Sequence, residues 1–259
     1  MAIETVDMWQ NTSIIPDENL AHRMGLIPIL ADATMFEHKI KGGENTTTNS
    51  IRFRLHAECT KKADGLAPLN NTQDEDALYN NANVYSGDLE WVPLDGQEEM
   101  FENAPRPLLD DILIAKMRPG QEIEMEVVCE KGEGKTHAKW SPVCTAFYRL
   151  MPDIRIIGED ITGEDAEELK ALCPMGVFDI EDMGKAVVAD SRKCTTCREC
   201  VRHEKFENRV DVGKLKDHFE FHVESVGMYA PEKLVFEALK ILKAKAVHWL
   251  EVIEAEESH

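Results

Sequence analysis

The sequence predicts an α+β fold, because some segments alternate apolar and polar residues while others repeat apolar residues at helical spacing. Strict alternation over residues 51–57, 122–128 and 218–224 is typical of half-buried strands. A long helical pattern over residues 231–254 and a short acidic one over residues 164–172 predict two helices. Strands and helices therefore share this chain.

The first 150 residues are predicted to be mostly β. Ile3, Val6 and Met8 fit neither a strand period nor a helix period, so residues 1–10 receive no assignment. A short helix over residues 20–25 ends at a glycine. Further extended segments are expected at residues 26–29, 84–94 and 112–115, and a polar loop at residues 61–83.

Two pairs of strands are expected from short connections. Residues 122–128 and 143–148 flank a glycine-containing turn and are predicted to form a β-hairpin. Residues 177–180 and 186–189 are strand-like and follow the acidic helix. The last helix is expected to begin at Pro231, because proline suits the first turn of a helix.

The last helix carries an apolar stripe with spacings of 4, 3, 4, 3 and 4 residues, close to a heptad period. Packing within its own domain is the ordinary role of such a face. Phe236, Ile241 and Val247 lie off the stripe, so the apolar surface extends to a second side, and we expect one side to contact a partner. The stripe consists of Val235, Leu239, Leu242, Ala246, Trp249 and Ile253.

Acidic residues dominate the charge: 49 Asp and Glu against 29 Lys and Arg give a formal net charge of −20 over 259 residues. Such a chain repels phosphate backbones and anionic membranes, so we expect no direct grip on nucleic acid and no membrane binding. Residues 1–20 lack the basic start and apolar stretch of a secretory signal. We therefore expect the chain to stay inside the cell.

Four of the seven cysteines define a candidate metal site. Cys194, Cys197 and Cys200 occur at every third residue, and Cys173, followed by Pro174, adds a thiol from a separate segment. Bacterial ferredoxins hold iron–sulfur clusters with a similar C-x2-C-x2-C run and Cys-Pro. Zinc more often takes cysteines in separated pairs. The pattern favours one 4Fe-4S or 3Fe-4S cluster, with zinc as the alternative.

The sequence contains no catalytic constellation. The segment around Lys135 lacks the first glycine of a phosphate loop, because Cys129 stands at that position. The segment that begins at His203 lacks the second histidine of a zinc-protease helix, and no G-x-S-x-G occurs. We therefore expect that the chain is not itself an enzyme.

Long ordered segments across nearly the whole chain provide a more specific signal. They include Asn11-Thr12-Ser13-Ile14, Leu20-Ala21-His22-Arg23-Met24-Gly25-Leu26-Ile27-Pro28, Ile112-Leu113-Ile114-Ala115-Lys116-Met117-Arg118-Pro119-Gly120-Gln121 and His137-Ala138-Lys139-Trp140-Ser141-Pro142-Val143. With these segments the chain resembles the α-like subunits of cellular RNA polymerases. The resemblance is greatest to the larger α-like subunit shared by eukaryotic polymerases I and III.

The resemblance implies a three-part architecture. A discontinuous α-type dimerisation domain would comprise residues 1–31 and 217–259, a mostly β insert domain residues 32–150, and a ferredoxin-like module residues 151–216. By the same resemblance, the dimerisation domain pairs with a smaller α-like subunit. That heterodimer is then the platform on which the large catalytic subunits assemble.

The resemblance also implies a role and a location. The chain would be a non-catalytic subunit in the nucleus, including the nucleolus, and would serve transcription of rRNA, 5S rRNA and tRNA. The apolar stripe would be partly interface, and His137, Lys139 and Trp140 would mark a loop that contacts other large or small polymerase subunits. A plain turn with Trp140 packed locally is the alternative.

Family members begin with a strand and a helix that precede the segment matched here by Met1 to Glu4, so we expect this sequence to start late relative to the family. Two other functions stay open. An iron–sulfur electron-transfer protein accounts for the cysteines but for little else. The polymerase II or archaeal counterpart is the other alternative.

Overall fold

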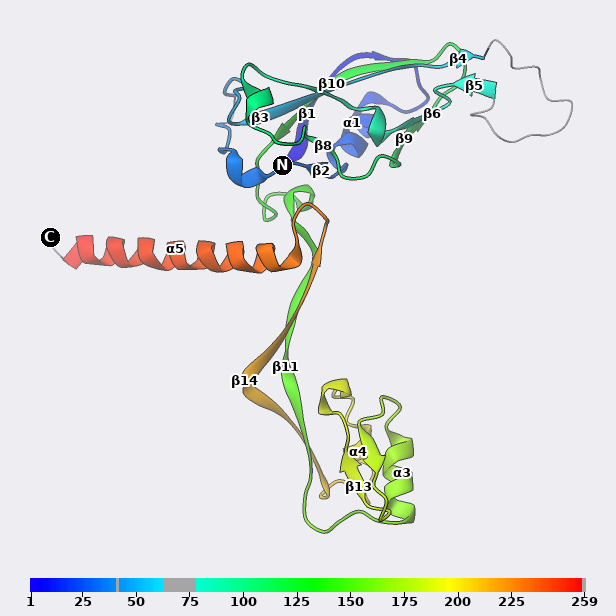
Figure 1. Ribbon diagram of the computed structural model, residues 1–259, viewed down its shortest axis with the longest axis vertical. Coiled ribbons are helices and arrows are strands. Elements are labelled where there is room, and N and C mark those ends of the chain that lie inside the picture. Colours follow the sequence, from blue (N-terminus) through cyan, green and yellow to red (C-terminus); the bar gives the residue numbers. More distant parts are fainter. Residues whose placement is uncertain (41, 63–77, 258–259) are drawn as a thin grey trace, which may run out of the picture. The chain divides into compact units, whose positions relative to one another are not determined.

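The computed structural model describes residues 1–40, 42–62 and 78–257, and it divides into two compact units (Figure 1). The first unit comprises Met1–Cys144 and Glu224–His259, and the second comprises Thr145–Val223. Strands and helices occur in both, so the predicted α+β class is confirmed. The three-part division implied by the resemblance stays a prediction. Within the described ranges, no helix is long and apolar enough to cross a membrane.

The first unit is built around a four-stranded antiparallel sheet in the order β1-β10-β3-β7. Alternate side chains, such as Phe53 and Met125, point into a fully buried core. Helix α1 (Asp17–Gly25) adds Leu20 and Met24 to this core. The four strands are β1 (Ala2–Asn11), β10 (Glu122–Glu130), β3 (Ser50–Glu58) and β7 (Glu90–Val92).

Strand β1 forms in a segment that has no regular apolar period. Its register against β10 shifts twice, so that Glu4 and Trp9 are additional residues on β1. A β-bulge inserts one residue and breaks the alternation of faces. The irregular spacing of the apolar residues near the N-terminus is therefore the result of two bulges in one long strand.

Short elements complete the first unit. The predicted extended segment at residues 84–94 is divided by a 3-10 helix (Ser86–Asp88), and part of the predicted loop, residues 63–77, lies outside the described residues. The short strand pairs are β2 (Ile29–Leu30) with β8 (Arg106–Pro107), β4 (Thr60–Lys61) with β5 (Tyr79–Asn80), and β6 (Asn83–Tyr85) with β9 (Leu113–Lys116).

The predicted hairpin between residues 122–128 and 143–148 is wrong. Strand β10 has β1 on one edge and β3 on the other, so neither edge accepts a further strand. The chain instead leaves the sheet, and β11 (Val143–Ile156) pairs with β14 (Val210–Ser225), as Figure 1 shows. The predicted strand at residues 218–224 is confirmed as part of β14.

The second unit packs a small core between one helix and short strands. Helix α3 (Glu164–Leu172) buries Ala166 and Leu169 against Phe178. The predicted acidic helix and the two strand-like segments after it are confirmed. The remaining elements are β12 (Phe178–Ile180), which pairs with β13 (Ala186–Val188), and α4 (Glu199–Arg202).

The C-terminal helix α5 (Pro231–Glu257) is an uninterrupted element of 27 residues in the first unit (Figure 1). A polar cluster connects its start to Asp32. Lys233 Nζ lies 3.0 Å from Asp32 Oδ2, and the Tyr229 hydroxyl donates to Asp32 Oδ1 at 3.1 Å. The same hydroxyl accepts a hydrogen bond from the Ala33 N–H at 2.6 Å. These bonds hold the chain just before and inside the first turn of α5.

This cluster makes the attachment of α5 sensitive to acid. Burial alone would raise the pKa of the Asp32 carboxyl, but hydrogen bonds from Thr34, Lys233 and Tyr229 outweigh it and lower the pKa from 3.8 to about 2. A carboxyl group whose pKa is lower in the folded than in the unfolded protein stabilises the folded state. This contribution is complete above the pKa of the unfolded protein and is lost as the pH falls through the pKa of the folded protein. The contribution should therefore disappear between about pH 4 and pH 2.

We expect Asp32→Asn to lower the free energy of unfolding at pH 7 by about 1 kcal/mol, a value reduced for the partial exposure of Asp32. Hydrogen exchange should become faster in the first turns of α5, because the ion pair with Lys233 is lost and the hydrogen bond from the Tyr229 hydroxyl no longer has a charged acceptor. Glu98→Gln, a change at an exposed carboxylate outside the cluster, is the control. Equal exchange rates in the two variants would contradict the role of Asp32.

Candidate metal site and contact surfaces

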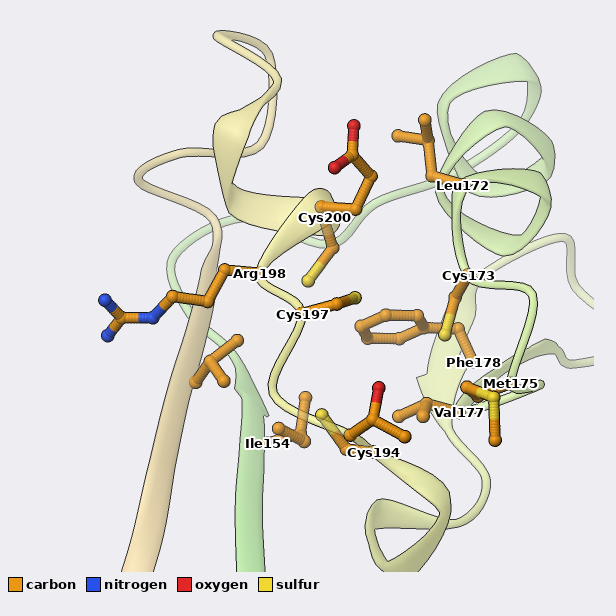
Figure 2. Close-up of a pocket in the computed structure, with 13 residues that line it drawn as sticks. Ile154, Leu172, Cys173, Met175, Val177, Phe178, Cys194, Cys197, Arg198 and Cys200 are labelled. Carbon is orange, nitrogen blue, oxygen red and sulfur yellow. The ribbon is translucent and has the colours of Figure 1, made fainter.

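The second unit brings together the four cysteines that the sequence singled out. Cys173 directly follows α3, Cys194 and Cys197 lie in the loop that leads into α4, and Cys200 lies in α4 itself. All four line one pocket, together with apolar side chains that include Phe178 (Figure 2). Cys197 is exposed and the other three are partly buried. The predicted ligands are therefore neighbours in space.

The loop that carries Cys194 and Cys197 has an unusual backbone. Thr196 and Arg198 have positive φ angles of 58° and 64°, in the left-handed region that residues other than glycine rarely adopt. The Thr196 N–H donates to Cys194 Sγ at 3.3 Å. Figure 2 shows the Arg198 side chain directed away from the cysteines. Such strain persists where a site requires it, and here it turns the loop around the pocket.

The thiols influence one another electrostatically. The pKa of Cys200 is raised, first by burial and then by the negative charge of the other three cysteines when they are ionised. Four neighbouring thiolates repel one another without a cation, whereas a metal requires the deprotonated form of each ligand. The donor set is therefore suited to a positively charged metal centre.

Four cysteine thiolates are ligands for two kinds of metal centre. A zinc ion binds all four at one atom, with Zn–S bonds of about 2.3 Å. An iron–sulfur cluster binds each cysteine at a different iron atom. The chemistry of the donor set fits both kinds of centre.

Ion pairs stabilise the second unit around the cysteines. Lys205 Nζ lies 2.7 Å from both Asp165 and Glu168, which connects α3 to the segment after α4. Arg149 donates to Glu220 at 2.6 Å, and Arg192 pairs with the same carboxylate. Many of the basic residues near the cysteines thus have acidic partners within the unit.

Helix α5 exposes the predicted stripe. Leu239, Leu242 and Trp249 are 59%, 64% and 63% exposed. Val235, Ala246 and Ile253 are also exposed, and so are the off-stripe residues Phe236, Ile241, Val247 and Leu250. Contiguous exposed apolar patches of this kind are rare on monomeric proteins and mark interaction surfaces. Most of this helix is therefore uncovered within the described chain.

The predicted contact loop is largely engaged with its own chain. Lys139 Nζ donates to the Ile3 carbonyl at 2.8 Å and pairs with Glu4, and its side chain is only 12% exposed. Trp140 Nε1 donates to the Glu130 carbonyl at 3.1 Å. His137 is exposed, and its Nδ1 accepts the Lys139 N–H. A contact of this loop with another subunit stays a prediction.

Known proteins match most of this architecture. The RNA polymerase Rpb3/RpoA insert domain family matches residues 6–145. The DNA-directed RNA polymerases I and III subunit RPAC1 of Mus musculus is 46% identical, over 99% of this chain and 75% of the mouse protein. The corresponding Dictyostelium discoideum protein is 44% identical, over 95% of this chain and 68% of that protein. The chain belongs to the α-like RNA polymerase subunit family.

Within the α-like family, the polymerase I and III branch is the better match. The polymerase II subunit rpb3 of Dictyostelium discoideum is 31% identical, over 95% of this chain and 80% of that protein, against 44% for the polymerase I and III subunit of the same organism. The resemblance drawn from the sequence segments is thus confirmed over the polymerase II alternative.

The sequence did not predict the contact between Gly132 and Trp140 that holds the loop around residues 137–140 in place. Gly132 allows the Trp140 ring to lie against the backbone, because a Cβ atom at residue 132 would overlap that ring. The glycine-containing turn was visible in the sequence, but its tryptophan contact depends on a neighbour eight residues away. No periodic pattern indicates such a contact.

We expect Gly132→Ala to destabilise the first unit by about 1–3 kcal/mol, because the added methyl group displaces the Trp140 ring. Thermal unfolding and the intrinsic tryptophan fluorescence of the chain would measure the change. Gly25→Ala is the matched control, since its Cβ would meet the Ile3 carbonyl oxygen at an ordinary 3.6 Å. Equal melting temperatures for both variants would disprove the packing argument.

Proposed function

We propose that this chain is a non-catalytic assembly subunit of nuclear RNA polymerases I and III, acting in transcription of rRNA, 5S rRNA and tRNA. Membership of the α-like family and the names of its relatives support this role. The proposed location is the nucleus, including the nucleolus. The proposed partners are a smaller α-like subunit, with which the chain dimerises, and the other large and small polymerase subunits.

The observation that carries this proposal is the uncovered apolar surface of α5. Nine large apolar side chains between residues 235 and 253 are more than two-fifths exposed. Burial of such side chains contributes on the order of 1 kcal/mol each, before the cost of association is subtracted. The near-heptad spacing of the stripe residues suits a second helix from a partner. A partner of the same α-like type would supply such a helix.

We also propose that Cys173, Cys194, Cys197 and Cys200 hold a 4Fe-4S or 3Fe-4S cluster, with zinc as the alternative. Support for a cluster comes from the four thiols that line one pocket, the left-handed backbone at Thr196 and Arg198, and the C-x2-C-x2-C spacing of the sequence. A bound cluster would supply cross-links between Cys173, at the end of α3, and residues 194–200, which include the start of α4. Since the core of this unit is small, these residues have a structural role, and family membership makes an electron-transfer protein the weaker alternative.

We expect the double variant Leu239→Gln and Leu242→Gln to lose heterodimer formation. Two polar side chains within the stripe should weaken association roughly 30-fold or more, while glutamine preserves the helix. Co-expression with the smaller α-like subunit and gel filtration would test this. The matched control is Lys240→Gln with Glu251→Gln, on the opposite side of α5, which keeps the net charge.

Failure of the unaltered chain to form a complex with the smaller subunit would argue against the proposed function. A complex that survives both double variants equally would place the interface elsewhere in the chain. Circular dichroism of each variant would verify that α5 remains helical.

We expect Cys197→Ser to lower the iron and sulfide content of anaerobically purified protein and to reduce its visible absorption. Residues 173–216 should then be cleaved faster by proteases, because the two cysteine segments are no longer joined. Cys144→Ser, at an exposed cysteine outside the site, is the control. Zinc in place of iron would support the alternative metal, and unchanged protease resistance would refute the structural role.

A further inference from the structure

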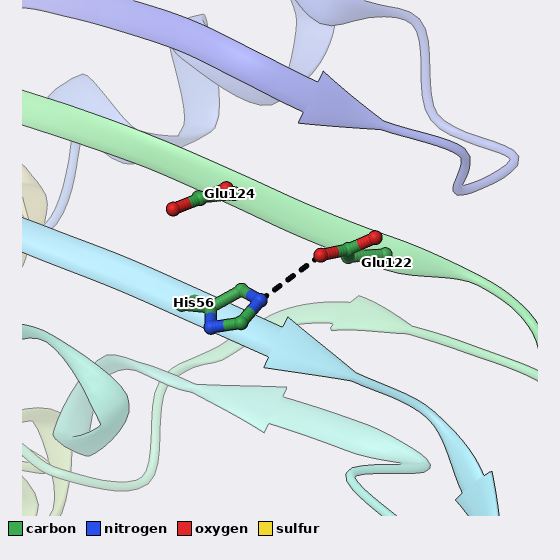
Figure 3. A group of neighbouring side chains, drawn as sticks. All are labelled: His56, Glu122 and Glu124. Carbon is green, nitrogen blue, oxygen red and sulfur yellow. Dashed lines mark hydrogen bonds and ion pairs between the residues drawn. The ribbon is translucent and has the colours of Figure 1, made fainter.

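The outer face of the main sheet in the first unit carries a second group of metal-binding side chains. His56 on β3 lies directly opposite Glu124 on β10, and Glu122 is two residues along the same strand face (Figure 3). His56 Nε2 is 3.0 Å from Glu122 Oε1. One ligand atom from each of the three residues lies within 4.8 Å of the other two. This group is separate from the cysteines, which lie in the second unit.

Three glutamates of β10 lie on this face, and two of them pair with an arginine of β3 while the third does not. Arg52 pairs with Glu126, and Arg54 Nη2 lies 2.5 Å from Glu124 Oε1. At the third position the partner of Glu122 is His56, which is positively charged only when it is protonated.

The strand register makes this imbalance greater. Glu122 stands directly opposite Glu58, and two like charges at directly opposite positions of an antiparallel pair destabilise it. A divalent cation at this end of the sheet would provide the positive charge that arginine provides at the other two positions.

From this geometry we propose that His56, Glu122 and Glu124 bind one Zn²⁺ ion. An imidazole nitrogen and two carboxylate oxygens are zinc ligands at about 2.0–2.2 Å, and water completes the fourth position of an exposed site. Among common divalent cations, a site that includes imidazole favours zinc over magnesium or calcium. Glu124 can keep its bond to Arg54 through Oε1 and offer Oε2 to the metal.

The sheet holds the three ligands in place. The neighbours of the ligands on the opposite face, Leu55, Ala57, Ile123 and Met125, are all buried in the core. Around the ligands β10 is paired on both edges, with β1 and with β3, while β3 pairs with β10 along residues 50–58 and with β7 only at residues 52–54. Small side-chain rotations therefore suffice to bring the ligand atoms around the ion, and little backbone order has to be gained on binding.

Zinc titration of the full chain at pH 7.5 tests this proposal. We expect the unaltered protein to bind one more equivalent of Zn²⁺ than His56→Ala by calorimetry or equilibrium dialysis. The cysteines are intact in every variant, so zinc bound there cancels in the comparison. Glu122→Gln should bind at least about tenfold more weakly at the sheet site, because one direct ligand is lost.

The matched control is Glu126→Gln, which alters the same face of β10 outside the proposed ligand set. It should keep the additional equivalent. Zinc should also raise the melting temperature of the unaltered chain more than that of His56→Ala. Equal zinc stoichiometry in the unaltered chain and His56→Ala would overturn the proposal. An equal loss of zinc affinity in Glu126→Gln and Glu122→Gln would also overturn the proposal. It would indicate that zinc is attracted only by the overall negative charge of this face.

Discussion

The position of β10 between β1 and β3 determines most of the first unit. Side chains alternate along a strand, so a register shift of one residue would move Ile123, Met125 and Val127 from the core to the solvent. This register also fixes the acidic residues of β10 on the outer face, opposite the basic residues of β3. Because both edges of β10 are occupied, the chain after Glu130 cannot form a hairpin with β10.

Contacts with the rest of the first unit hold the start of helix α5. The bonds from Tyr229 and Lys233 to Asp32 hold only its beginning, while most of its apolar residues stay exposed. An isolated helix in water gains little stability from backbone bonding alone, and tertiary packing normally supplies the remainder. A helix held at one end and apolar along its length is therefore suited to presenting an interface to a partner.

The sequence predicted elements whose periods are regular and missed features that depend on distant pairing. Strand β3 and helices α3 and α5 follow unbroken apolar periods, and the cysteine spacing located the candidate metal site. Strand β1 was not predicted, because bulges at Glu4 and Trp9 interrupt the alternation of its apolar and polar residues. The hairpin prediction failed because local turn signals carry no information on strands far away in sequence. The ion pairs between β3 and β10 join residues more than 60 positions apart, which no local pattern indicates.

The cysteine loop shows why a structural role suits the proposed cluster. A left-handed backbone at Thr196 and Arg198 costs of order 1–3 kcal/mol per residue, and such conformations persist where their surroundings determine them. Here the surroundings are a small core, with Cys173, Cys194 and Cys200 packed at its border. The ion pairs of Lys205 fasten α3 to the segment after α4 but do not reach the loop itself. A centre that binds Cys173 and the loop together would provide the constraint that the strained backbone requires.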